Sequence, residues 1–262
     1  MSAPARAVAI IACGALAREL TQLLARSRFA HIRLFCLPAW LHNHPDRIPE
    51  AVRAKIRALR PRFSRIFVAY ADCGTAGALD RVLSEEGVER LPGPHCYAFY
   101  AGAEVFQRLH EEEPATFYLT DYLVRHFDRL IIQGLGLDRH PQLLSAYFGN
   151  YRRLVYLAQS RDGELLRRAR RAAERLGLAF EHRHTGFGEL ARFVERAREA
   201  ADGRADDPVL AGHSGPGAGP GGEADGAAAL AAILSRRHRP RRHARRTARQ
   251  RRLSRRLAEG RG

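Results

Sequence analysis

The chain has 262 residues, 45% of them hydrophobic, and no apolar stretch reaches the roughly 18 to 20 residues of a membrane-spanning helix. It can bury a core, which excludes a fully disordered chain and an integral membrane protein. The net charge of +16 is concentrated in residues 236–262, which contain 13 arginines and one acid. The preceding 235 residues hold 31 basic and 27 acidic side chains, so the body is nearly balanced. The high charge is therefore only a weak indication of nucleic-acid binding.

The first apolar run, residues 7–17, allows two interpretations. It follows a single Arg6, and Ile10 to Cys13 would pass as a lipoprotein cleavage box. Against export, Gly14 interrupts the run, and a helical pattern of leucines starts directly after Cys13 with no flexible linker. We therefore favour a buried first strand over an export signal.

Short apolar runs rich in β-branched and aromatic residues alternate along the chain with longer segments of helical period. This alternation is typical of βα units around a parallel sheet. The expected strands are 7–12, 32–36, 65–70, 88–91, 116–119, 153–157 and 179–183. The expected helices are 15–27, 49–59, 75–86, 103–112, 163–176 and 187–200. Residues 121–150 are expected to form helices with Gly and Pro breaks.

This order predicts an α/β fold: a Rossmann-like, open, mostly parallel sheet flanked by helices, with a helical insertion around residues 121–150. Residues 1–200 are expected to form a single α/β domain. Beyond Ala201 the chain is rich in Gly, Pro and Ala and ends in the arginine run. Residues 201–262 are therefore predicted to be a disordered linker and basic tail.

The four cysteines all lie at or after the ends of predicted strands. Cys13 comes just after the first strand, Cys36 ends the second, Cys73 follows the third, and Cys96 lies in the loop after the fourth. The carboxyl ends of parallel strands meet at one edge of a sheet, where such folds bind ligands. We therefore expect the four thiols to approach that edge.

Two of these cysteines precede a glycine and a predicted helix. A helix N-terminus lowers the pKa of a thiol, so thiolate is expected near neutral pH. Gly14 and Gly74 would let the backbone approach a bound cofactor. The turn from Asp72 to Thr75 also resembles an anion-binding turn in which Thr75 caps the helix, and Asp72 could act as a general base or only cap the turn.

These positions support one main hypothesis. Cys13, Cys73 and Cys96, completed by His95 or Cys36 or left open for a substrate, would suit a zinc ion or an iron–sulfur cluster. No Cys-x-x-Cys pair is present, so the hypothesis depends on topology. If the fourth position is open, the site is chemical and not merely structural.

Three alternatives stay open. Cys73 beside Asp72 could form the catalytic pair of a metal-free enzyme. Two or more cysteines could be ordinary buried thiols. The chain could instead be a non-catalytic binding protein whose Arg-rich tail, residues 236–262, contacts nucleic acid or an acidic partner by charge alone.

The other polar candidates are less specific. Asp121 follows the predicted strand 116–119 and so lies on the presumed ligand edge. The loop containing Trp40, His42 and His44 could cover the same edge or be an ordinary surface loop. The chain has no Gly-x-Gly-x-x-Gly turn, phosphate-binding loop or serine-hydrolase elbow, which disfavours a standard dinucleotide fold.

A set of short motifs carries a family resemblance. They are Ala12-Cys13-Gly14-Ala15, Leu37-Pro38-Ala39, Leu41-His42-Asn43, Asp72-Cys73-Gly74-Thr75, His95-Cys96-Tyr97, Leu119-Thr120-Asp121, Gly134-Leu135-Gly136-Leu137 and Tyr156-Leu157-Ala158-Gln159. Together they resemble the prokaryotic domain of unknown function sixteen thirty-eight (DUF1638) over about residues 7–198. The resemblance implies a cytoplasmic protein of undetermined activity. Members of this family are often encoded near corrinoid-dependent methyltransferases, a contextual hint that names proteins of such systems as possible partners and an enzyme or accessory factor in corrinoid-linked methyl transfer or one-carbon metabolism as a possible role. The resemblance supplies no established catalytic residues.

Overall fold

The computed structural model describes residues 7–25, 29–91, 93 and 95–201. The predicted linker and basic tail lie almost entirely beyond them, since the last described residue is Ala201. Within the described ranges, strands alternate with helices and every strand pair is parallel. The predicted α/β class is therefore confirmed.

The first sheet has the strand order β2-β1-β3-β4. Its central strand β1 consists of Val-Ala-Ile-Ile-Ala-Cys, and every residue in it is buried because strands pair with it on both sides. Its edge strand β4 has only two residues. The bounds are β1 Val8–Cys13, β2 Ile32–Leu37, β3 Arg65–Ala69 and β4 Glu89–Arg90.

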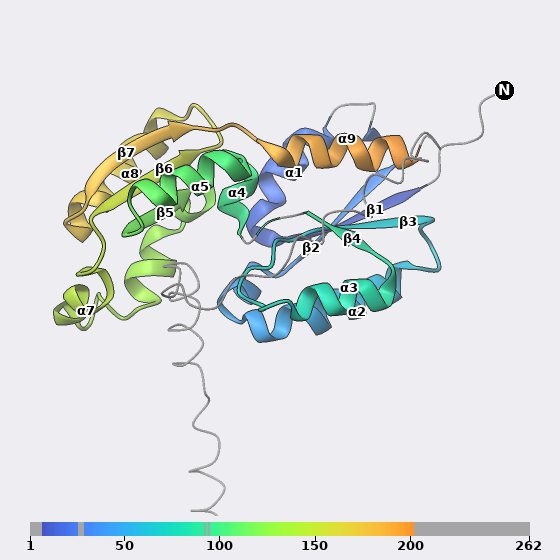
Figure 1. Cartoon of the computed structure of the whole chain (residues 1–262), viewed down its shortest axis with the longest axis horizontal. Coiled ribbons are helices and arrows are strands. Elements are labelled where there is room, and N and C mark those ends of the chain that lie inside the picture. Colours follow the sequence, from blue (N-terminus) through green and yellow to red (C-terminus); the bar gives the residue numbers. More distant parts are fainter. Residues whose placement is uncertain (1–6, 26–28, 92, 94, 202–262) are drawn as a thin grey trace, which may run out of the picture.

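Helices cover both faces of this sheet. Figure 1 shows α1 and α9 on one face and α2 and α3 on the other. Their bounds are α1 Ala17–Leu24, α2 Ile48–Leu59, α3 Ala78–Glu86 and α9 Glu189–Ala201, and short 3₁₀ turns cover Gly14–Leu16, Ala39–Asn43 and Pro45–Arg47.

The second sheet has the order β5-β6-β7, with strands Thr116–Thr120, Arg153–Ala158 and Ala179–His184. Before it come α4 Cys96–Ala101 and α5 Ala103–Glu112. Helix α8, Gly163–Leu176, connects β6 to β7. The predicted helical insertion is confirmed as the connection from β5 to β6, formed by α6 Asp121–Arg125, a π-helical turn Asp128–Gln133, a 3₁₀ turn Pro141–Leu143 and α7 Leu144–Phe148.

The strands are divided between two sheets, where the sequence predicts one open sheet. Each sheet has its own hydrophobic core, and β4 and β5 are not paired with each other. Helix α9 follows β7 but buries Leu190, Phe193 and Val194 in the core of the first sheet. It also contacts α4 (Figure 1). Each sheet with its helices forms one unit of the fold. The two units are connected by the chain between β4 and β5, and by α9, which follows β7 but packs against the first sheet.

The largest differences from the predicted helices are at the start of α3 and at α4. Helix α3 begins at Ala78 instead of Thr75, because the backbone before it turns through positive φ angles at Cys73, Gly74, Ala76 and Gly77. Cys96 was expected in a loop, but it begins α4. None of the described helices combines the length and the apolar composition needed to cross a bilayer.

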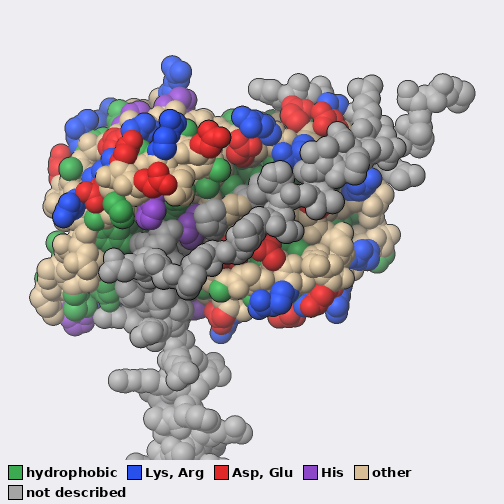
Figure 2. Space-filling model, in the orientation of Figure 1, with side chains coloured by type: hydrophobic (Ala, Val, Ile, Leu, Met, Phe, Trp, Pro, Cys, Tyr) green, Lys and Arg blue, Asp and Glu red, His purple; other side chains and the backbone are tan. Residues whose placement is uncertain are grey.

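The described surface carries charges of both signs. Figure 2 shows basic and acidic side chains interspersed on the face it draws, without one continuous basic patch there. This agrees with the nearly balanced charge of residues 1–235.

Candidate functional site

Cys13 ends β1 and caps the 3₁₀ turn after it. Its Sγ accepts a hydrogen bond of 3.5 Å from the amide of Ala15. The thiol is buried, and loss of water around the thiolate raises its pKa to about 11 despite this hydrogen bond. The predicted lowering of this pKa is therefore wrong, because burial outweighs the favourable turn.

Cys73 lies in the turn after β3, at a positive φ of 50°. Because α3 begins only at Ala78, the thiol is not at the helix N-terminus, as the sequence suggested. Its pKa is raised well above the usual value, first by burial and then by the charges of Cys96 and Cys13. The prediction of an activated Cys73 thiolate beside Asp72 is therefore wrong, because burial raises the pKa of this thiol.

Cys96 is the first residue of α4, and His95 is its N-cap residue. Burial, and then the charge of Cys13, raise the pKa of Cys96 to about 12. The His95 ring packs against that of Tyr97, with centroids 6.3 Å apart. The fourth thiol, Cys36, is exposed, although partial burial still raises its pKa.

Tyr70 connects these thiols. It directly follows β3 and is 1% exposed, and its pKa is raised by burial and by the charges of Cys13, Cys73 and Cys36. Its hydroxyl lies near the Cys13 thiol but makes no hydrogen bond of good geometry among the described residues. Native proteins rarely leave a buried hydroxyl in this state.

The described residues contain no preformed metal centre. No group of three or more His, Cys, Asp or Glu side chains in these ranges is arranged to hold an ion. The charges of Cys96 and Cys13 nevertheless raise the pKa of Cys73, and the charge of Cys13 raises that of Cys96, so these thiols are neighbours. The expected zinc or iron–sulfur site therefore stays a prediction.

Hydrogen bonds to the Asp72 side chain stabilise the turn after β3. The Asp72 carboxylate accepts hydrogen bonds from the Thr75 hydroxyl at 2.7 Å, the Gly77 amide at 2.9 Å and the Ala76 amide at 3.2 Å. Burial alone would raise the pKa of Asp72, but these bonds lower it. The two amides that directly follow the predicted anion-binding turn are thus already bonded to Asp72. The Thr75 hydroxyl also accepts from the Leu79 amide at 3.4 Å, although Gly77 is the N-cap of α3.

The two glycines proposed to bind a cofactor occupy different surroundings. A Cβ on Gly14 would lie 2.8 Å from the Leu37 carbonyl oxygen and 3.0 Å from the Ala39 amide nitrogen. Gly14 therefore permits the end of β1 to approach the segment after β2. Gly74 has a φ of 79° and no backbone atom so close.

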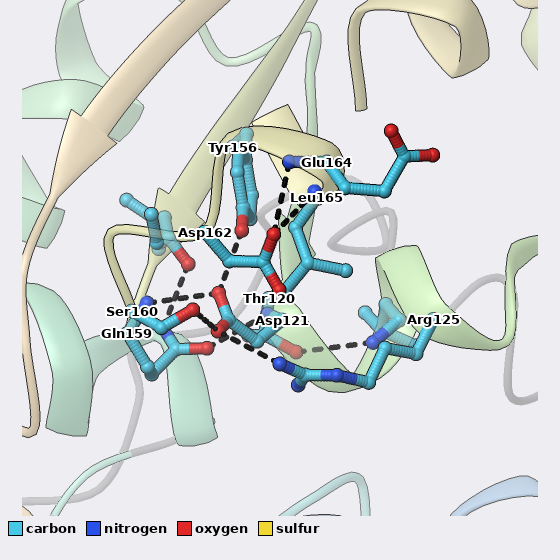
Figure 3. Close-up of polar contacts among 12 residues, drawn as sticks. Thr120, Asp121, Arg125, Tyr156, Gln159, Ser160, Asp162, Glu164 and Leu165 are labelled. Carbon is cyan, nitrogen blue, oxygen red and sulfur yellow. Dashed lines mark hydrogen bonds and ion pairs between the residues drawn. The ribbon is translucent and has the colours of Figure 1, made fainter. Parts of the chain in front are cut away.

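A second polar cluster lies at the carboxyl edge of the second sheet, centred on Asp121 (Figure 3). Its Oδ1 accepts from the Tyr156 hydroxyl at 2.7 Å and the Gln159 amide at 2.9 Å. Its Oδ2 accepts from the Ser160 hydroxyl at 2.5 Å and lies 3.5 Å from the Arg125 guanidinium. This fully buried carboxylate is therefore bonded on both oxygens. The sequence placed Asp121 at this edge, whereas Tyr156 and Gln159 entered only as family motifs.

The buried acid Glu19 on α1 was not predicted. Glu19 is 3% exposed, and its Oε2 has no hydrogen-bond partner among the described residues. Burial, and next the charge of Asp121, raise its pKa. The pKa of Tyr100 in α4 is raised well above the usual value, chiefly by burial and next by the charges of Glu19, Cys96 and Asp121. The thiols and the carboxylates therefore adjoin where the two sheets meet.

Comparison with protein families gives a match over residues 36–194 to the family described as Protein of unknown function (DUF1638). No curated protein and no solved structure matches the chain. The matched segment contains Cys36, Cys73, Cys96 and Asp121, and it begins after β1, which the structure places at the centre of the first sheet. The match covers more than half of the sequence, so the chain belongs to the DUF1638 family.

Proposed function

We propose that the chain binds a thiophilic metal centre, a zinc ion or an iron–sulfur cluster, through Cys13, Cys73 and Cys96. The observation that carries this proposal is the proximity of the three thiols: the charges of Cys96 and Cys13 raise the pKa of Cys73, and the charge of Cys13 raises that of Cys96. These thiols are contributed by the end of β1, by the turn after β3 and by the start of α4. Thiolates are the ligands that both kinds of centre prefer.

Burial, and after it the charges of neighbouring thiols, raise the pKa values of Cys13, Cys73 and Cys96, so these thiols keep their protons unless a cation compensates the charge of the thiolates. A bound cation reverses this balance, and its binding releases the thiol protons. The Tyr70 hydroxyl would then donate a hydrogen bond to a ligand sulfur, as outer-shell groups of metal sites do.

The fourth position has two candidates. His95 directly precedes Cys96, and Cys36 pairs in register with Ala12 at the end of β2. A zinc ion would activate a thiol or water at an open position, whereas a cluster would transfer electrons. A role as an enzyme or accessory factor in corrinoid-linked methyl transfer or one-carbon metabolism, in the cytoplasm, is the part of this proposal that depends on the family resemblance.

Anaerobic purification with metal and sulfide quantification tests the proposal. The wild type should contain stoichiometric zinc, or iron with a visible absorption band, and Cys73→Ser should lose it. Cys36→Ser is the matched variant, because it removes an exposed thiol and reduces metal content only if Cys36 is the fourth ligand. A colourless, metal-free wild type that stays metal-free after reconstitution would exclude the proposal.

The other functional hypotheses have less support. The raised pKa values of all four thiols argue against a metal-free enzyme with an activated cysteine. Nucleic-acid binding through residues 236–262 stays a prediction, since these residues lie outside the described ranges. Deletion of residues 236–262 should abolish such binding and its salt dependence.

A further inference from the structure

A small cavity of about 80 Å³ lies where α1 meets the carboxyl ends of β5 and β6. Arg18 and Glu19 of α1 form one side, and Arg125 of α6 and Ser160 form part of the other. The cavity therefore joins the two units of the fold. It is separate from the proposed thiol site, since no cysteine is among its lining residues.

The two aspartates in the cavity wall are already compensated. Asp121 accepts hydrogen bonds on both carboxylate oxygens (Figure 3). Asp162 accepts from the first amides of α8, those of Glu164 at 2.9 Å and Leu165 at 3.3 Å. Their negative charges are thus offset by local donors and by the positive end of α8.

Glu19 supplies the independent sign that a ligand belongs here. Glu19 lines the cavity and is 3% exposed, and its Oε2 has no hydrogen-bond partner among the described residues. Burial favours the neutral acid form, which can donate a hydrogen bond. The charged or titratable groups that face or affect Glu19 are Arg18 on its own helix, Asp121 and Arg125 on α6, and Cys96 and Tyr100 on α4.

We infer that this cavity binds the carboxylate of a small organic acid, between the guanidinium groups of Arg18 and Arg125 and the Glu19 carboxyl group. The volume is sufficient for a carboxylate group with one or two waters. A second cavity of about 420 Å³, bordered by Tyr156, Leu166 and His182, also has Ser160 and Asp162 in its wall. The rest of an organic acid would extend into this adjoining space, whose size is typical of ligand sites.

Calorimetric titration of the full chain with acetate tests the site. Saturable binding is expected in the wild type, and Arg18→Gln should weaken it about 10-fold, since one charge-assisted hydrogen bond is lost. Arg108→Gln is the matched control, because Arg108 is an exposed arginine on α5 and lines neither cavity. Glu19→Gln should retain or strengthen binding, since the amide donates a hydrogen bond and carries no negative charge.

Further probes separate the alternatives. Binding of inorganic phosphate with the same dependence on Arg18 would support an oxyanion site of broader scope. The inference is overturned if neither anion binds saturably, if Arg18→Gln binds like the wild type, or if Mn²⁺ binds and Glu19→Gln abolishes that binding. Metal content should be the same in Arg18→Gln and wild type, so the test is independent of the proposed thiol centre.

Discussion

The Tyr156 hydroxyl donates a hydrogen bond of 2.7 Å to Oδ1 of Asp121, and this contact ties β6 to the start of α6. Both side chains are 1% exposed. A buried carboxylate is costly unless donors compensate it, so each donor on Asp121 contributes to the stability of the second sheet. Burial and the bond to Asp121 also raise the pKa of Tyr156.

Tyr156→Phe should therefore destabilise the fold. The substitution removes one donor from a buried charge and should lower the free energy of unfolding by about 1.5–3 kcal/mol. Tyr147→Phe is the matched control, because Tyr147 is only partly buried and forms no part of the Asp121 cluster. Urea denaturation followed by circular dichroism measures both, and equal small effects would show that the Asp121 contact contributes little.

The buried strands β1 and β6 could be predicted from the sequence because their residues form short, nearly uninterrupted apolar runs. Val8–Cys13 and Arg153–Ala158 are almost entirely buried in parallel sheets, where β-branched and aromatic side chains fit. The division of the strands into two sheets could not be predicted. The division depends on two features. The two-residue strand β4 does not pair with β5, and α9, which follows the second sheet in the chain, packs against the first sheet.

The site was only partly predictable. The predicted topology correctly indicated that the thiols and Asp121 come at or after strand ends. It did not indicate how deeply the thiols are buried, and this burial raises the pKa values of Cys13 and Cys73, which were expected to be lowered. Glu19 was missed because a charged residue on an amphipathic helix is expected to face solvent, and its burial arises only when a second unit covers α1. Cys96–Ala101 was missed as a helix because its six apolar and aromatic residues show no helical period.

Gly188 should be essential for docking α9. It has a φ of 48°, and a Cβ there would lie 2.3 Å from the Phe99 carbonyl oxygen and 2.5 Å from that of Tyr100. Gly188→Ala should force α4 and the start of α9 apart and cost about 3 kcal/mol or more, combining overpacking with backbone strain.

Gly186→Ala is the matched control for this substitution. Gly186 has a similar φ of 58°, but nothing lies within 4 Å of its added Cβ. It should therefore cost only the left-handed backbone strain, about 1 kcal/mol. Thermal unfolding of both variants measures the difference, and equal stabilities would contradict the close approach of α4 and Gly188.

Alkylation should distinguish the exposed thiol from the buried ones. Iodoacetamide at pH 7 should modify Cys36 first, because it is exposed, whereas Cys13 is buried and has a pKa of about 11. Peptide mass spectrometry of metal-free protein against time gives the order of reaction. Faster labelling of Cys73 than of Cys36 would instead support a catalytic thiol beside Asp72.

The metal-free fold should lose stability in alkaline solution. The pKa values of Cys13 and Cys96 are raised from 9.0 to about 11 and about 12, so above pH 9 the unfolded chain releases protons that the folded chain keeps. Proton release favours the unfolded state, and the free energy of unfolding should fall from pH 9 toward pH 11 by up to about 1.4 kcal/mol per pH unit for each thiol.

Cys96→Ser should reduce this alkaline slope, because serine does not titrate in that range, and Cys36→Ser should change it less, because Cys36 is exposed. Urea denaturation at pH 8, 9 and 10 measures the slopes. With metal bound, the dependence should reverse: folded thiolates would be favoured, and stability would fall on acidification as protons compete with the metal. A metal-free protein whose stability rises between pH 9 and 10 would show that its folded thiols ionise more easily than the unfolded ones, and that burial does not control them.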